Sequence, residues 1–179
     1  IEMKKRLYDE LPSEKLPNLL YKNEGNLTFK EVGNNSALND PSFSNGAAYA
    51  DLDNDGDLEI IVNNIDEDAF IYKNLSIENN LGNYLKVRAN GILSENFAKG
   101  TLYFENRSRV KEFKRVRGYL SSVSDELHFG LGKASKIDSL VVEWSSGKKK
   151  VFYEIDVNQT ITVNEKNSEF IDNEKDKSK

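Results

Sequence analysis

The sequence predicts an all-β chain made of two units with different surfaces. Helical periodicity is nearly absent, and 21 asparagines stand mostly beside Gly, Asp or Ser, as in chains with many tight turns. The hydrophobic fraction is 37 %, against a usual globular value of about 45–50 %, which favours short elements around thin cores. The sign of the net charge also reverses once along the chain, which indicates two units rather than one.

The charge reversal places the domain boundary. Residues 1–83 carry 16 acidic and 7 basic side chains, whereas residues 84–164 carry 9 acidic and 14 basic ones. The Asn-Asn-Leu-Gly-Asn run at 79–83 is the best linker candidate between these blocks. We therefore expect domains at 1–83 and 84–164, followed by a polar tail at 165–179 that is disordered.

The elements follow in order from the apolar runs between polar turns. Only residues 4–11, before Pro12, favour a turn or two of helix. The turns Asn23–Asn26 and Ser145–Lys148 each predict a hairpin. Candidate strands in the first block are 18–22, 27–32, 46–51, 58–63 and 69–74, and those in the second are 84–89, 100–105, 110–117, 127–130, 138–144, 148–153 and 159–164.

The first block repeats itself, and this predicts its architecture. Leu20-Tyr-Lys-Asn-Glu-Gly is echoed 51 residues later by Ile71-Tyr-Lys-Asn-Leu-Ser. A period of about 50 residues built from short strands is typical of radial β architectures, so we expect one to two β-propeller-type blades. Two copies are too few to close a propeller, and we expect a fragment of a larger repeat protein. The second block is expected to form a small antiparallel β-sandwich or barrel-like domain.

Composition excludes several classes of site. Without cysteine the chain has no disulfide scaffold, thiolate zinc site or Cys nucleophile. No apolar run approaches the roughly 18–20 residues of a membrane span. His128 is the one histidine, and we expect it to make a structural hydrogen bond rather than to serve a catalytic triad.

One motif carries chemistry: Asp51-Leu-Asp-Asn-Asp-Gly-Asp-Leu-Glu59. Aspartates at alternate positions place their carboxylates on one side of a tight loop, which Gly56 allows to turn. Without a cation these charges would repel one another, and an all-oxygen donor set without His or Cys favours Ca²⁺. The alternative is a solvated acidic turn at a hairpin tip.

The predicted metal site is not an EF-hand, because position twelve is Val62 and a strand follows the loop. We expect a structural Ca²⁺ ion that clamps the flanking strands together. The expected ligands are the side chains of Asp51, Asp53 and Asp55, the backbone carbonyl of Asp57, and Glu59 closing the shell.

Two families resemble parts of this sequence. The acidic motif, preceded by Phe43-Ser-Asn-Gly-Ala-Ala-Tyr-Ala, resembles an FG-GAP/VCBS-type propeller repeat, although Glu59 stands where that family usually has Asp. Leu127-His-Phe-Gly-Leu-Gly132, Ile137-Asp-Ser-Leu-Val-Val-Glu-Trp-Ser-Ser-Gly147 and Asn158-Gln-Thr-Ile-Thr-Val resemble the ASPIC/UnbV domain of cartilage-acidic-protein-like and bacterial surface proteins. The resemblance implies a Ca²⁺ ion in the loop, an extracellular or cell-surface location with the bacterial outer surface suspected, and no established catalytic activity.

A cluster of basic residues between positions 107 and 117 does not by itself identify a binding partner. The cluster is dense enough to bind an anion such as an acidic glycan, or to complement the acidic first block, or it is a solvated strand face. A nucleic-acid partner is not expected, because Phe113 is the only aromatic residue within 105–117 and base stacking needs interleaved aromatic rings. The cluster comprises Arg107, Arg109, Lys111, Lys114, Arg115 and Arg117.

The sequence thus predicts a non-enzymatic, calcium-stabilised interaction or scaffold module with a protein or glycan partner on the cell surface. A glycan-binding adhesin module is one alternative. A metal-assisted hydrolase that uses the 51–59 loop is another, but a fully coordinated cation leaves no open position for substrate. Open sheet edges also make self-association possible.

Overall fold

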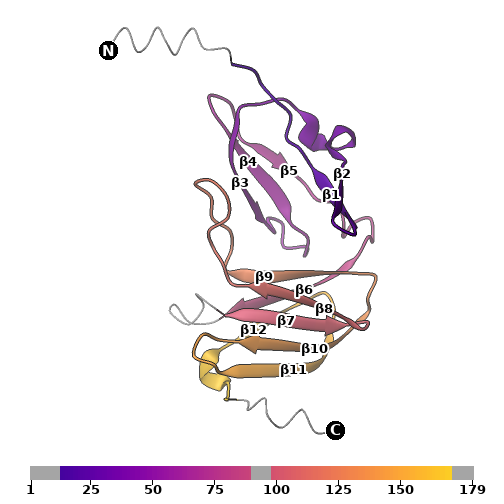
Figure 1. Ribbon diagram of the computed structural model, residues 1–179, viewed down its shortest axis with the longest axis vertical. Coiled ribbons are helices and arrows are strands. Elements are labelled where there is room, and N and C mark those ends of the chain that lie inside the picture. Colours follow the sequence, from indigo (N-terminus) through magenta and orange to yellow (C-terminus); the bar gives the residue numbers. More distant parts are fainter. Residues whose placement is uncertain (1–12, 90–97, 171–179) are drawn as a thin grey trace, which may run out of the picture. The chain divides into compact units, whose positions relative to one another are not determined.

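The computed structural model describes residues 13–89 and 98–170 of the 179-residue chain, and within them the protein is all-β, as the sequence predicts (Figure 1). The helical turn expected at 4–11 lies outside the described residues. The strands are β1 (Tyr21–Gly25), β2 (Thr28–Glu31), β3 (Ser44–Ala50), β4 (Glu59–Asn64), β5 (Phe70–Tyr72), β6 (Asn83–Ala89), β7 (Lys99–Phe104), β8 (Arg107–Glu112), β9 (Glu126–Gly132), β10 (Lys136–Glu143), β11 (Lys149–Asp156) and β12 (Gln159–Val163).

The internal contacts divide the chain into two units. One comprises Ile1–Ala47 and Ile61–Tyr72, and the other Ala48–Ile60 and Lys73–Lys179. This division differs from the boundary near residue 83 that the charge reversal suggests, because the acidic loop groups with the later part of the chain. The loop and strands β6 to β12 are therefore described together as the second unit.

The first unit contains the hairpin β1–β2, whose turn the sequence predicts, and β3, β4 and β5 form a three-stranded sheet. Within its described residues only Leu38 and Val62 are buried hydrophobic side chains. Large apolar side chains such as Leu27 and Phe29 lie exposed instead, at 96 % and 62 %. This unit therefore has a thin core and much uncovered apolar surface.

The second unit is built around a sandwich of two sheets, with strand orders β11-β10-β7-β8 and β12-β6-β9. Both sheets contribute to one core, which includes Leu85 and Phe129 from one sheet and Leu102 and Leu140 from the other. The pairs are antiparallel except for β12 with β6, which is parallel. The five strands between β6 and β12 supply the long connection that a parallel pair requires.

The β7–β8 hairpin begins its second strand earlier than the sequence predicts. The sequence gives 110–117, whereas β8 is Arg107–Glu112. Glu105 and Asn106 both have positive φ, at 47° and 56°, and they form the two-residue turn that matches strand twist. Because this turn has Glu rather than Asn or Asp at its first position and no glycine at its second, the sequence does not indicate a hairpin turn here.

The sandwich continues past residue 164, where the polar tail was expected to begin. Glu165–Asn167 form a 3-10 turn capped by the Asn164 side chain, and Lys149 pairs with Glu169 in an isolated bridge. Residues 171–179 lie outside the described part of the chain. No helix among residues 13–89 and 98–170 has the length and apolar character to cross a membrane.

Candidate metal centre

The acidic loop, Asp51–Glu59, connects β3 to β4 and is folded by its own carboxylates. Asp51 Oδ2 accepts a hydrogen bond from Gly56 N at 3.1 Å, and Asp55 Oδ1 accepts one from Asp57 N at 2.9 Å. Asn54 and Gly56 supply the turn, with φ of 61° and 108°. Short side chains that bond to nearby backbone amides favour such turns, so the alternation of aspartates fixes the loop shape.

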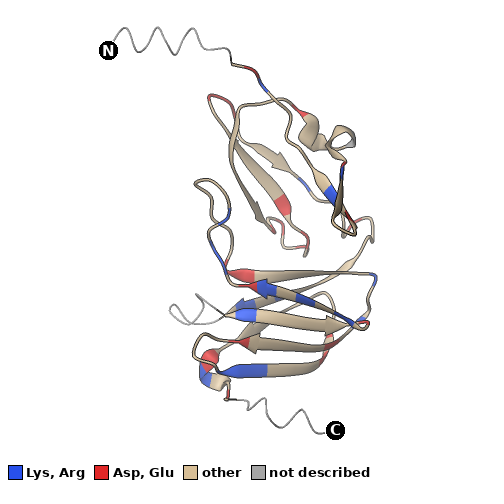
Figure 2. Ribbon diagram, viewed as in Figure 1, with Lys and Arg blue, Asp and Glu red and all other residues tan. Residues whose placement is uncertain are grey.

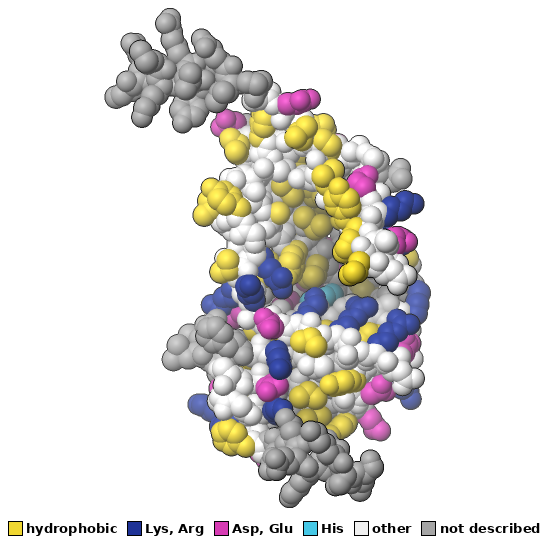
Figure 3. All heavy atoms as spheres, viewed as in Figure 1, with side chains coloured by type: hydrophobic (Ala, Val, Ile, Leu, Met, Phe, Trp, Pro, Cys, Tyr) yellow, Lys and Arg dark blue, Asp and Glu magenta, His cyan; other side chains and the backbone are white. Residues whose placement is uncertain are grey.

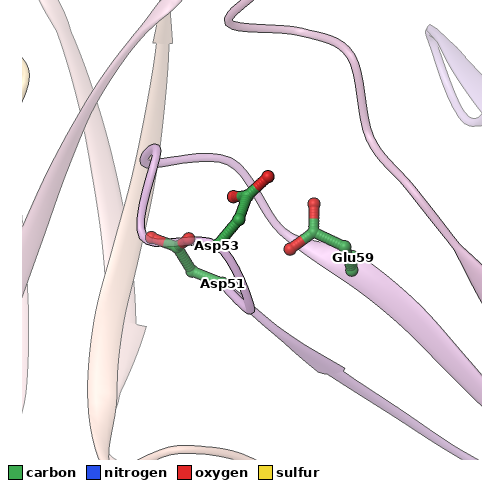
Figure 4. A group of neighbouring side chains, drawn as sticks. All are labelled: Asp51, Asp53 and Glu59. Carbon is green, nitrogen blue, oxygen red and sulfur yellow. The ribbon is translucent and has the colours of Figure 1, made fainter.

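Three of the five predicted ligands come together. Asp51, Asp53 and Glu59 each offer a carboxylate oxygen, and these atoms lie within 4.8 Å of one another (Figure 4). Asp51 and Glu59 stand at the two ends of the loop, so closing the loop brings them beside Asp53. An acidic group of this kind can hold a metal ion.

Two buried oxygens of this group have no hydrogen-bond partner in the described parts of the chain. Glu59 Oε2 accepts from Leu52 N at 2.8 Å, but Oε1 is unpartnered, and the residue is 3 % exposed. Asp51 bonds through Oδ2 and leaves Oδ1 unpartnered, with its side chain 3 % exposed. A buried charged oxygen without a partner costs about 1–3 kcal/mol or more, and a cation beside both oxygens would remove that cost.

A second acidic group shares Asp53, and a lysine pairs with two of its three carboxylates. Asp53, Asp55 and Glu78 also offer oxygens within 4.8 Å of one another. Lys73 Nζ lies 3.0 Å from Asp53 Oδ2 and 2.8 Å from Glu78 Oε1. Hydrogen bonds from Lys73 lower the pKa of both carboxyls, and both carboxyls raise the pKa of Lys73.

The Asp57 side chain belongs to neither group. Its Oδ2 accepts a hydrogen bond from Ile77 N at 3.1 Å, and the residue is buried. Burial raises the pKa of Asp57, and the charges of Asp55 and Glu59 add to this. We expected only the backbone carbonyl of Asp57 as a ligand. The second side-chain oxygen, Asp57 Oδ1, is buried without a hydrogen-bond partner in the described residues.

Strands β6 and β9 each contribute one side chain that bonds to the acidic loop. Lys86 forms a buried ion pair with Asp51, and the exposed side-chain fractions are 5 % and 3 %. The His128 ring donates through Nε2 to Gly56 O at 2.7 Å, as the expectation of a structural histidine requires. Burial lowers the pKa of His128, which favours the neutral ring. The proton of this bond lies on Nε2, because a carbonyl oxygen only accepts.

Gly56 also meets Tyr84 so closely that no side chain fits. A Cβ added at Gly56 would lie 1.9 Å from Tyr84 Cε1. The Tyr84 ring stacks on His128 with centroids 5.8 Å apart, which holds it in place. Glycine at this position therefore serves both the left-handed turn and the close approach to β6.

Sequence reasoning missed Glu78, Lys73 and Lys86. Glu78 and Lys73 carry no pattern that links them to the loop, because their approach depends on how the chain returns after β5. Lys86 did carry a signal, since it is a charged residue between Leu85 and Val87 in a strand whose neighbours are fully buried. A buried lysine requires a carboxylate partner, and Asp51 is that partner.

Comparisons with known families match both parts of the chain. Residues 13–62 match the model of the FG-GAP-like repeat, and residues 98–170 match that of the ASPIC and UnbV family. The first match contains the whole acidic loop, and the order of the two agrees with the resemblance predicted from the sequence. No curated protein matches the chain. The two families indicate a repeat-type module of the extracellular space or cell surface.

Proposed function

We propose, from the pairing of an FG-GAP-like repeat with an ASPIC and UnbV domain in one chain, that the protein is a non-enzymatic interaction or scaffold module stabilised by one Ca²⁺ ion. Its place is the outer surface of a bacterial cell, and its partner is a protein or a glycan. The observation that carries the calcium claim is the pair of buried oxygens, Asp51 Oδ1 and Glu59 Oε1, that lack a partner beside Asp53.

Calcium fits this donor set better than other common ions. The donors are carboxylate oxygens, which excludes the soft-ligand sites that zinc and copper prefer. Ca²⁺ accepts six to eight oxygens in flexible geometry, whereas Mg²⁺ demands a near-ideal octahedron and keeps several waters. Asp51, Asp53 and Glu59 would supply side-chain oxygens, and Asp55 and the carbonyl of Asp57 complete the proposed shell.

The structural role of the ion follows from what surrounds the loop. The one histidine uses Nε2 to hold Gly56 O, so that nitrogen is not a free general base beside the site. Asp51 and Glu59 lie at the junctions of the loop with β3 and β4. An ion bound to both would tie the ends of the two strands together.

The uncovered apolar surface of the first unit supports the interaction role. Figure 3 shows hydrophobic side chains gathered on this unit. The large exposed apolar residues of the unit include Leu19, Leu27, Phe29 and Ile71. Apolar patches of this kind mark interaction surfaces, and in repeat arrays neighbouring repeats cover them. We infer that further repeats of a larger protein, or a second copy of this chain, cover the first unit.

Melting with and without calcium tests the proposed function. Ca²⁺ at about 100 times its dissociation constant adds about 2.7 kcal/mol to a state that alone binds it, which for a chain of this size raises Tm by about 5–10 °C. EDTA should remove this shift, and Mg²⁺ should reproduce little of it. Asp53→Ala should abolish the difference, whereas Asp138→Ala, which removes an exposed acid from β10, should keep it. If the wild type melts at the same temperature in EDTA and in calcium, the calcium claim is wrong.

A further inference from the structure

The edge strand β8 carries a row of cations on the face of its sheet that is directed toward the core. Arg107, Arg109 and Lys111 alternate along it, and they pair in register with buried residues of β7, namely Phe104, Leu102 and Gly100. Side chains at alternate positions share one face of a sheet, so the cations lie on the face that β7 turns toward the core. All six residues of β8 are nevertheless exposed, because the sheet ends there.

Two members of the basic cluster are engaged within the second unit. Arg109 donates to Gly130 O on β9 and lies over the Phe104 ring, 5.5 Å from its centroid. Arg115 forms an ion pair with Asp125. These contacts fasten Arg109 and Arg115 to the edge of the sandwich. The other four cations of the cluster take no part in them.

Four cations of the cluster have no acidic partner within residues 13–89 and 98–170: Arg107, Lys111, Lys114 and Arg117. The acidic loop uses Lys73 and Lys86 instead, so it does not neutralise them. These four cations thus carry positive charge that no ion pair within the described residues compensates.

Three of these cations converge on one hollow. Lys111, Lys114 and Arg117 line it together with Glu112 and Glu126. Glu126 Oε2 already accepts from Arg88 at 3.0 Å, so Glu112 is the remaining carboxylate against the three cations at this hollow. Figure 2 shows the basic positions along β8, and in Figure 3 Lys and Arg side chains gather over the same strand.

We propose that this basic surface, formed by Arg107, Lys111, Lys114 and Arg117, binds an acidic polysaccharide that carries carboxylate or sulfate groups. Arg107 and Lys111 lie four residues apart on β8, about 14 Å along the strand, and Lys114 and Arg117 follow the end of that strand. The surface therefore offers several separated charges, which suits a chain of anions better than a single one. Arginine pairs with carboxylate or sulfate through two parallel N–H donors.

The chemistry of the surface favours a polysaccharide over a single-stranded nucleic acid. Base stacking requires exposed aromatic rings, and Phe113, the one aromatic among residues 107–117, is 6 % exposed. The proposal names a partner class for the interaction module proposed above, and in that sense rests on it. It does not involve the calcium ion, so the two claims fail separately.

Titration of the whole chain with defined polymers tests this assignment. The probes are polygalacturonate and dextran sulfate, with neutral dextran as the uncharged reference. We expect binding to both charged polymers, none to dextran, and weakening between about 50 and 300 mM NaCl as the charges are screened. The triple variant Lys111→Gln/Lys114→Gln/Arg117→Gln should bind at least about tenfold more weakly.

A second triple variant provides the matched control. Lys30→Gln/Lys136→Gln/Lys166→Gln removes the same charge from exposed lysines on other elements and should bind within about twofold of the wild type. Equal weakening in both variants would overturn the proposal, because net charge alone would then explain binding. Absence of binding at 50 mM NaCl would also overturn it, and so would salt-sensitive self-association that the first triple variant abolishes, because the cations would then serve a second copy. The calcium-dependent Tm shift should be the same in all three proteins.

Discussion

Replacing Lys86 by methionine is expected to lower the free energy of unfolding of the second unit by about 3–5 kcal/mol in EDTA. Lys86 and Asp51 form an ion pair whose side chains are 5 % and 3 % exposed. Methionine keeps the length of the side chain but leaves the Asp51 carboxylate buried beside Glu59 without its cation. Breaking one side of a buried pair is costly because the remaining charge has lost both water and partner.

Chemical denaturation in urea measures this loss, and Lys99→Met is the matched control. Lys99 pairs with Glu143 at 3.1 Å, but the side chains are 47 % and 32 % exposed. An exposed pair contributes about 0–1 kcal/mol, so the same substitution there should have a small effect. Saturating Ca²⁺ should reduce the loss for Lys86→Met, because the ion would then compensate Asp51. If Lys86→Met costs no more than Lys99→Met in EDTA, the buried pair does not hold the loop.

Gly56→Ala is expected to destabilise the loop by about 2–5 kcal/mol and to weaken calcium binding. The position combines a φ of 108° with a Cβ site 1.9 Å from Tyr84 Cε1. A side chain in the left-handed region costs about 1–3 kcal/mol, and forcing a methyl group against a packed ring costs about as much again. The Tyr84 ring cannot withdraw freely because it stacks on His128.

Two further variants separate the collision from the backbone strain. Gly25→Ala has a comparable φ of 88° with nothing within 4 Å of the added Cβ, so it should show the strain alone. Tyr84→Leu should rescue part of the loss when combined with Gly56→Ala, and the double-mutant cycle measures that coupling. Equal losses for Gly56→Ala and Gly25→Ala in urea denaturation would show that the contact with Tyr84 has no energetic role.

The fold was largely predictable because its signals are local. Each candidate strand was an apolar run between turn residues, and the structure has a strand at or beside each of them, with Ser44–Ala50 in place of 46–51 as one example. Where the local signal is weak the prediction shifts, as at Glu105 and Asn106, whose turn carries no glycine. The parallel pairing of β6 with β12 joins distant segments, and local patterns do not contain that information.

The residues of the candidate site also divide into those with a local sequence signal and those without one. The alternation of Asp51, Asp53 and Asp55 is a local pattern, so these carboxylates could be named as candidate ligands from the sequence. The structure brings Asp51 and Asp53 together with Glu59 and places Asp55 in the second group, with Asp53 and Glu78. Lys86 and His128 follow the loop by more than 25 residues, and their contacts depend on tertiary packing. Only the buried run around Lys86 indicated a missing partner, and it did not say which carboxylate that partner was.

Locating the ion tests the central claim most directly. Crystals of the protein grown in calcium should show one anomalous peak in the acidic loop, about 2.3–2.6 Å from Asp51 Oδ1, Asp53 and Glu59 Oε1. The same experiment on Asp53→Ala should lose the peak. A saturated crystal with no ion in the loop, or with one bound only by Asp55 and Glu78 in place of Lys73, would contradict the account.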